Sequence, residues 1–378
     1  MMRQNVKSAN NLYGGARVAT SYNAGAFGLN SLDILFSVLI IYFFSPRFWE
    51  IASLFLPASR ILSNPNNFDL LQAAILSLGF VGIAVKWELM AKIIYRFTFL
   101  FIMIGAASLS VFWSIDKAQT LKAAIYLGLI ISFATALGLR FGESKLANIA
   151  LISTFSLIVV QMLLSISKFS SAQMLAPSDF EISYCLVCAF WAMSSNTKYA
   201  LFYAPIVLFC GAIVLLNQDI MGISVLIAIA GAYCVIFFSR LNNGEIISIS
   251  GSIGVLVLLA TFLVLGFGQQ GFEYVAQTLG DFSLKSLIGN GYGLGQGKIQ
   301  TYLIDGLGLI GILLGVFFVF FASLVAILSA KNRPSIVVAI FGFIALVMAN
   351  FPAIGYNWGI LILLFASVII GLIPIRKS

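Results

Sequence analysis

The stretch ALFYAPIVLFCGAIVLLNQDIMGISVLIAIAGAYCVIFFS, from Ala200 to Ser239, consists of two apolar runs separated by the short polar turn 217–219. Each run lies in the range of about 17 to 25 residues that an α-helix needs to cross the hydrocarbon core of a membrane. Asp219, in the turn, is the one charged residue of this stretch. The pattern predicts two transmembrane helices joined by a tight turn that pins Asp219 close to the membrane surface.

The rest of the chain repeats this pattern. Of its 378 residues, 61% are hydrophobic and 9% are charged, and the mean hydropathy is +1.05, whereas about a quarter of the residues of a soluble domain are charged. We therefore predict an all-α fold, a polytopic transmembrane helical bundle of about 12 spans. Residues 1–30 form a cytoplasmic segment and residues 31–378 a single transmembrane domain. The predicted spans are 31–45, 70–85, 93–113, 121–139, 146–167, 181–194, 200–216, 220–239, 246–265, 303–329, 335–350 and 358–374.

The distribution of basic residues predicts the orientation. Cytoplasmic loops keep an excess of Lys and Arg, and an inner N-terminus places most of the 21 basic residues on the inner side. We therefore expect both termini to be cytoplasmic and the long loop 266–300, before span 10, to be extracytoplasmic. The net charge of +8 then reflects membrane topology and not a nucleic-acid surface. No apolar segment with a cleavage site precedes residue 30, so we expect no cleaved signal peptide.

Cysteine and histidine usage restricts the chemistry. Cys185, Cys188, Cys210 and Cys234 all fall inside apolar runs, where we interpret them as small packing residues. The chain has no histidine, which disfavours a zinc site at the Cys185/Cys188 pair and histidine-based acid–base catalysis. We expect no metal and no cofactor, and chemistry carried by carboxylates, lysines, arginines and tyrosines.

The long loop contains the glycine-rich stretch GNGYGLGQGK, from Gly289 to Lys298. A nucleotide-binding glycine loop needs a cytosolic supply of nucleotide and Ser or Thr after its lysine, whereas this stretch is expected on the outer side and Ile299 follows Lys298. Non-helical backbone near a membrane survives where protein or a water-filled cavity satisfies it. The stretch is therefore predicted to lie over a polar cavity on the outer face.

The residues after the glycines supply candidate reactive groups. If the next helix extends back to Lys298, then Lys298, Tyr302 and Asp305 are spaced i, i+4, i+7 and share one stripe. Small residues continue close to this stripe and allow near approach of a neighbouring helix. They are Gly308, Gly311 and Gly315. The simpler interpretation is that Lys298 and Asp305 are solvated boundary charges. We expect solvated positions for most other outer charges, although Asp219 is more informative because its turn is short. These charges are Arg47, Arg60, Lys122, Lys168, Asp179, Glu181, Asp219 and Lys285.

Two segments resemble one known family. SVFWSIDKAQTLKAAIYLGLIIS, from Ser110 to Ser132, is similar to the S-x-x-W-S-x-D segment and following helix of the O-antigen ligase and O-antigen or exopolysaccharide polymerase superfamily. LIGNGYG, from Leu287 to Gly293, resembles the G-x-G-x-G stretch of that family's large periplasmic loop, and YLIDGLGLIG, from Tyr302 to Gly311, resembles the entry into its next span.

The resemblance implies a membrane glycosyltransferase of the GT-C-like type in the bacterial inner membrane. Its donor and acceptor would be oligosaccharides linked to undecaprenyl pyrophosphate, its neighbours a flippase and a chain-length regulator, and nucleic acid would play no part. Ligases of the family carry a His-Asn pair before the Y-L element and often Ser-Arg-Gly at the eighth span. Here the corresponding residues are KIQTYL and NQDIMG, which favours a polymerase over a ligase that transfers polymer to lipid A-core.

Roles follow from the chemistry of such a transfer. Outer cations stabilise the pyrophosphate leaving group, and the candidates are Lys298, Lys285, Arg47 and Arg60. A carboxylate takes the proton of the acceptor hydroxyl, and the candidates are Asp305 and Asp219. Tyr302, Gly289, Gly291 and Gly293 are predicted to line the substrate cavity. A secondary transporter is the alternative from another class, although transporters tend to place ionisable residues near the membrane midplane.

Overall fold

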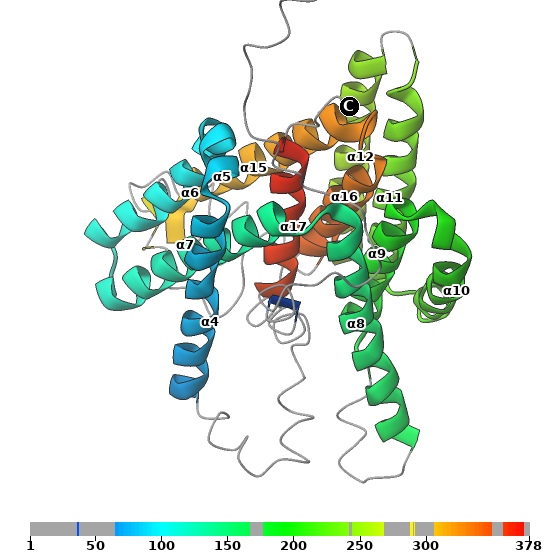
Figure 1. Cartoon of the computed structure of the whole chain (residues 1–378), viewed down its shortest axis with the longest axis horizontal. Coiled ribbons are helices and arrows are strands. Elements are labelled where there is room, and N and C mark those ends of the chain that lie inside the picture. Colours follow the sequence, from blue (N-terminus) through cyan, green and yellow to red (C-terminus); the bar gives the residue numbers. More distant parts are fainter. Residues whose placement is uncertain are drawn as a thin grey trace, which may run out of the picture.

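The computed structural model describes residues 36–37, 65–166, 177–241, 244–267, 288–289, 291, 306–349 and 358–373. The regular elements in these ranges are all helices (Figure 1). The α-helices are α4 (Pro65–Val85), α5 (Trp87–Ile93), α6 (Thr98–Leu109), α7 (Lys117–Arg140), α8 (Glu143–Ile166), α9 (Asp179–Ser195), α10 (Ala200–Leu216), α11 (Ile220–Phe238), α12 (Gly244–Phe267), α15 (Gly306–Ala330), α16 (Pro334–Ala349) and α17 (Trp358–Leu372). Short 3₁₀ turns are η1 (Ile94–Phe97), η2 (Ser110–Phe112) and η4 (Thr197–Tyr199).

The all-α prediction is confirmed for these ranges, and the chain is a membrane protein by the length and composition of its helices. Among the described residues, 6 helical segments are long and apolar enough to cross a membrane. These are Trp87–Phe112, Lys117–Arg140, Glu143–Leu163, Thr197–Leu216, Ile220–Phe238 and Leu313–Ala330. Shorter apolar helices cover Leu71–Val85, Ile246–Val257, Pro334–Met348 and Gly359–Leu372. The total of about 12 spans and the loop 266–300 stay predictions, because most of 31–45 and of that loop lies outside the described residues.

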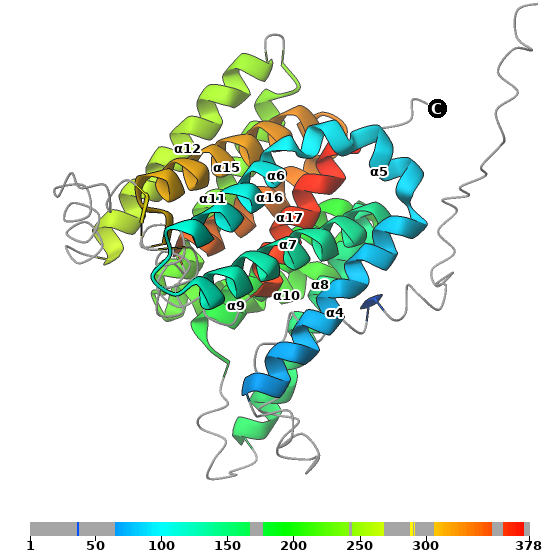
Figure 2. The ribbon, with the colours of Figure 1, turned by 90° about the vertical axis from the view of Figure 1, so that its left-hand side faces the viewer.

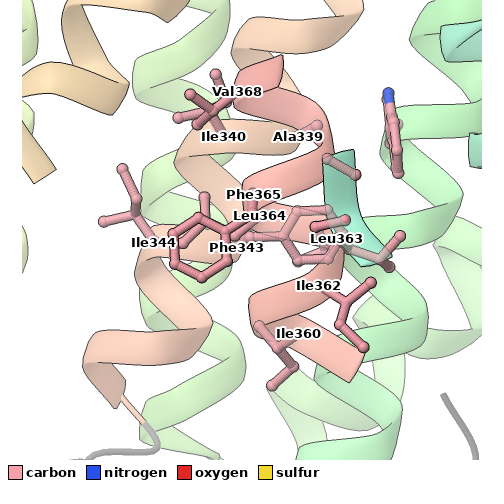
Figure 3. Close-up of a cluster of buried hydrophobic side chains, with 14 of the residues drawn as sticks. Ala339, Ile340, Phe343, Ile344, Ile360, Ile362, Leu363, Leu364, Phe365 and Val368 are labelled. Carbon is pink, nitrogen blue, oxygen red and sulfur yellow. The ribbon is translucent and has the colours of Figure 1, made fainter. Parts of the chain in front are cut away.

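The centre of the bundle is formed by α16 and α17, which Figure 1 shows between the α4–α7 group and the α8–α12 group. Both helices are apolar on all sides, as expected of helices surrounded by others. Phe343 of α16 is fully buried and stacks edge-on against Trp191 of α9, with ring centroids 5.8 Å apart. Figure 3 shows side chains of the two helices interlocked, among them Phe343, Ile344 and Phe365.

Small residues bring the outer helices close to this centre. A Cβ at Gly79 of α4 would lie 2.6 Å from the backbone N of Phe133 in α7, so this crossing depends on the absence of a side chain. Gly138, near the end of α7, packs in the same way against Ile369 of α17. Small residues at such crossings are the usual means of close helix packing in membranes.

Arginines gather at one end of the bundle, which we call the basic end. Arg96 donates a hydrogen bond from Nη1 to the carbonyl of Leu372 at 2.8 Å, and Arg333 donates one to the carbonyl of Ile370. Both contacts place positive charge at the C-terminus of α17, where the helix dipole favours it. Arg140 ends α7 two residues after Gly138, so it lies at the same end. These three arginines at one end agree with the uneven distribution of basic residues in the sequence. Which side of the membrane the basic end faces stays a prediction.

The cysteines are free, as far as the described residues show. Cys185, Cys188 and Cys210 are buried, which confirms the packing interpretation for these three. Cys234 is exposed on α11, so the packing interpretation is wrong for it. An apolar surface of a transmembrane helix meets lipid, which accepts a weakly polar thiol.

Candidate functional site

The turn between α6 and α7 is built by the segment SVFWSID. Asp116 is the N-cap of α7 and accepts a hydrogen bond from the backbone N–H of Gln119 at 3.0 Å. Ser114 lies within hydrogen-bond distance of the Thr120 hydroxyl, at 2.6 Å, and its Oγ donates to the carbonyl of Asp116 at 2.9 Å. Capping side chains satisfy the N–H groups that the first helical turn leaves unpaired. The segment therefore fixes the start of α7 and the position of Trp113 just before it.

Trp113 and Ser114 join this turn to the glycine-rich stretch. The indole Nε1 of Trp113 donates a hydrogen bond to the carbonyl of Ile288 at 2.9 Å. Gly291 adopts φ +114°, and a Cβ on it would lie 2.5 Å from Cβ and 2.9 Å from Cα of Ser114. Such a φ is open to glycine and costly for other residues. We call the contact of Trp113 and Ser114 with Ile288 and Gly291 the Trp113 seat.

The seat lies at the end of the bundle opposite the basic end. Asp116 begins α7 and Arg140 ends it, so the two residues stand at opposite ends of the same helix. Phe99, in the first turn of α6, contacts Phe318 and Phe321 of α15, with ring centroids 6.2 and 5.6 Å apart, and Figure 2 shows α15 beside α6. Segments separated by 175 residues, those of Trp113 and Ile288, thus meet at one place.

The start of α15 differs from the expected continuous helix. The helix begins at Gly306, and Gly308 has φ 54° and ψ −138°, outside the helical region. The helical spacing expected through Gly308 is therefore interrupted at this residue, while the shared stripe of Lys298, Tyr302 and Asp305 lies outside the described residues and stays a prediction. Glycine fits the helical pattern of the sequence and also tolerates this conformation.

Asp219 has a structural role in this fold. It is the N-cap of α11, and its carboxylate accepts hydrogen bonds from the backbone N–H of Met221 at 3.2 Å and of Gly222 at 2.7 Å. The hydroxyl of Ser183 also donates to it, at 3.1 Å. This geometry supports capping and not proton transfer as the role of Asp219.

Glu181 is buried, so the expectation of a solvated side chain is wrong. It is 4% exposed and forms a capping box with Ser178 at the start of α9. The amide Nε2 of Gln161, on α8, donates to its Oε1 at 3.1 Å. The capping box and a partner from the neighbouring helix together account for a buried carboxylate. Asp179, by contrast, is exposed and accepts a hydrogen bond from Asn217 Nδ2 at 3.0 Å.

The structure describes three of the predicted site residues. Gly291 belongs to the Trp113 seat, Gly289 follows Ile288 of that seat in the sequence, and Asp219 caps a helix. The other seven lie outside the described residues, so their roles stay predictions. They are Asp305, Lys298, Tyr302, Gly293, Lys285, Arg47 and Arg60. Sequence reasoning did not assign a site role to Trp113 or Ser114, although both belong to the segment that carries the family resemblance.

No described group of three or more Cys, Asp or Glu side chains is arranged to hold a metal ion. Comparison with known proteins gives no match to a family model, to a curated protein or to a solved structure. The arrangement of the Trp113 seat is therefore the principal guide to function.

Proposed function

We propose that the protein is a glycosyltransferase that joins lipid-linked oligosaccharide repeat units into a polysaccharide, with its site at the end of the bundle that carries the Trp113 seat. The observation behind this proposal is the contact of Trp113 with Ile288 and of Ser114 with Gly291. These residues belong to the two segments in which the resemblance to the polymerase and ligase superfamily was noted. Two motifs far apart in sequence that meet in space are typical of a functional site.

The proposed reaction is transfer of a glycan from a polyprenyl pyrophosphate donor. The acceptor hydroxyl attacks the anomeric carbon of the donor, the bond from that carbon to the pyrophosphate oxygen breaks, and the pyrophosphate leaves with the electron pair. We assign the acceptor proton to Asp305, since the carboxylate of Asp219 caps α11. Lys298 stabilises the negative charge that develops on the leaving group. The scheme needs no nucleotide and no metal ion.

The proposed orientation follows from the charges. Arg96, Arg140 and Arg333 mark the basic end, which we assign to the cytoplasm of the bacterial inner membrane. The seat and the loop 266–300 then face the periplasm, where lipid-linked repeat units are joined. A cysteine introduced at Gln296 should react with an impermeant maleimide added outside intact spheroplasts. Labelling only after the membrane is opened would reverse the orientation and end the proposal.

The activity is tested with purified protein in nanodiscs that is given lipid-linked repeat units alone. We expect a ladder of longer lipid-linked chains without nucleotide sugar or ATP. Transfer of preformed chains to lipid A-core without extension of the repeat units would identify a ligase. Movement of a solute across liposomes without any glycan product would identify a transporter. In the native host, deletion followed by mass analysis of the lipid-linked glycans should show accumulated single repeat units.

A further inference from the structure

The α6–α7 turn exposes large apolar side chains on both sides of the Trp113 seat. Phe112 is 80% exposed and Ile115 is 72% exposed, whereas Trp113 and Ser114, which lie between them in the sequence, are engaged in the seat. Leu121, in the second turn of α7, is exposed as well. Exposed apolar side chains at the end of a transmembrane helix lie where hydrocarbon gives way to water.

Cationic side chains stand beside this apolar surface. Lys117, the first residue of α7, is exposed and follows Ile115 by two positions. Lys122 is exposed in the second turn. Both lie at the end of α7 opposite Arg140 and therefore away from the basic end. The charge bias that explains the arginines of the basic end does not explain lysines here.

Resting on the proposed function, we infer that the α6–α7 turn binds the polyprenyl pyrophosphate part of the lipid-linked substrate. Phe112 and Ile115 contact the isoprenoid chain, and Lys117 contacts the phosphate groups. The substrate is an apolar chain that ends in a doubly charged head group, and the turn offers an apolar surface that ends in a cation. A lysine–phosphate contact is charge-assisted and stronger than a neutral hydrogen bond. Phe112 and Ile115 flank Trp113 and Ser114 in the sequence, so the turn that would hold the head group also carries the contacts with Ile288 and Gly291.

The test measures binding apart from catalysis. The probe is undecaprenyl pyrophosphate without a sugar, which cannot be polymerised, added to the full chain in phosphatidylcholine nanodiscs. A photoreactive p-benzoylphenylalanine replaces Phe112 in one variant and Leu201 in the control. Leu201 is 86% exposed at the start of α10, on a helix remote from the seat in sequence and packing. We expect cross-linking to the probe from position 112 to exceed that from position 201 at least tenfold, about the ratio that one strong polar contact produces.

The lysine is tested in the same assay. Lys117→Gln should lower the cross-linking yield from position 112 about tenfold at subsaturating probe, because it removes the charge and leaves a polar side chain that is only one atom shorter. Lys198→Gln is the matched control, since Lys198 is exposed in η4. Uncharged undecaprenol should cross-link equally to the parent and to the Lys117→Gln variant.

Three results would overturn the inference. They are equal cross-linking from positions 112 and 201, no effect of Lys117→Gln, and equal competition by phosphatidylglycerol, which would show contact with bulk anionic lipid. The same experiments test the proposed function independently of this binding surface. Probe binding at position 112 without any polymer ladder would remove the polymerase proposal and leave the binding surface, whereas a ladder without cross-linking would remove this surface alone.

Discussion

Gly291→Ala is the substitution that tests the Trp113 seat most directly. The new Cβ would lie 2.5 Å from Cβ and 2.9 Å from Cα of Ser114, distances that side-chain atoms do not reach without displacement. Alanine at φ +114° adds a conformational cost of about 1 to 2 kcal/mol. Relief of the overlap costs about 1 to 3 kcal/mol more, as in other overpacked contacts. The hydrogen bond from Trp113 to Ile288 contributes only about 1 kcal/mol, so the seat should open while the helices stay folded.

Fluorescence and polymer yield together report this opening. In a variant that keeps Trp113 as its only tryptophan, Gly291→Ala should shift the emission to longer wavelength, because the indole loses its partner and meets water. A cost of about 3 kcal/mol lowers the population in which Trp113 contacts Ile288 about a hundredfold. Polymer yield should fall at least about tenfold, while the thermal unfolding midpoint changes little.

Two matched variants separate the seat from general effects. Gly105→Ala places a methyl group on α6, with no atom within 4 Å of the new Cβ, and should leave emission and polymer unchanged. Ser114→Gly combined with Gly291→Ala removes the overlapping Cβ and Oγ of Ser114. It should shift the Trp113 emission part of the way back to the wavelength of the parent protein. If Gly291→Ala behaves like Gly105→Ala in both assays, the seat has no role in activity and the reasoning is refuted.

Further substitutions test individual side chains. Trp113→Phe removes the indole donor to Ile288 and keeps an aromatic ring, so polymer yield should fall about fivefold, as for a hydrogen bond of about 1 kcal/mol; an unchanged yield would contradict a role for the bond. Asp219→Ala should lower the free energy of unfolding by about 1 kcal/mol, because α11 loses its cap. Asp219→Asn can still cap the helix and should keep both the stability and the polymer yield. Loss of polymer in Asp219→Asn at normal stability would show that Asp219 is a catalytic base. Lys298→Ala and Asp305→Asn should each reduce chain extension at least about tenfold while the amount of protein in the membrane stays normal. Lys168→Ala is the control. Full-length polymer from both the Lys298 and the Asp305 variant would remove these residues from the mechanism.

The helices were predictable because the apolar runs set their positions. The run 220–239 became α11, Ile220–Phe238, and the run 121–139 lies inside α7, Lys117–Arg140. Hydrophobic length decides such elements locally, since a backbone in hydrocarbon must satisfy its own hydrogen bonds. The caps were also present in the sequence. Ser178 and Glu181 have the spacing of a capping box, but Glu181 was interpreted as a solvated charge because its partner Gln161 comes from another helix.

The remaining features depend on contacts between distant segments. The hydrogen bond from Trp113 to Ile288 joins residues 175 positions apart, and no periodicity encodes such a pairing. Resemblance to one family marked both segments, and the structure adds that they touch. The kink at Gly308 was equally hidden, because a glycine fits the i, i+3, i+7 pattern of a helix face and also permits φ 54°.

The polar residues at the seat end have a consequence for how an anion is held there. The helices α7 and α11 both begin at carboxylate caps, Asp116 and Asp219, and α9 begins at the Ser178–Glu181 capping box. The N-terminus of a helix attracts anions through its free N–H groups and its dipole, but in these three helices protein carboxylates already occupy that position. A pyrophosphate at this end therefore cannot rely on the helix termini of α7, α9 or α11. On these three helices the charge of a pyrophosphate would have to be matched by side-chain cations, so we expect lysines there, and not the dipoles of α7, α9 and α11, to contribute to binding of the proposed donor.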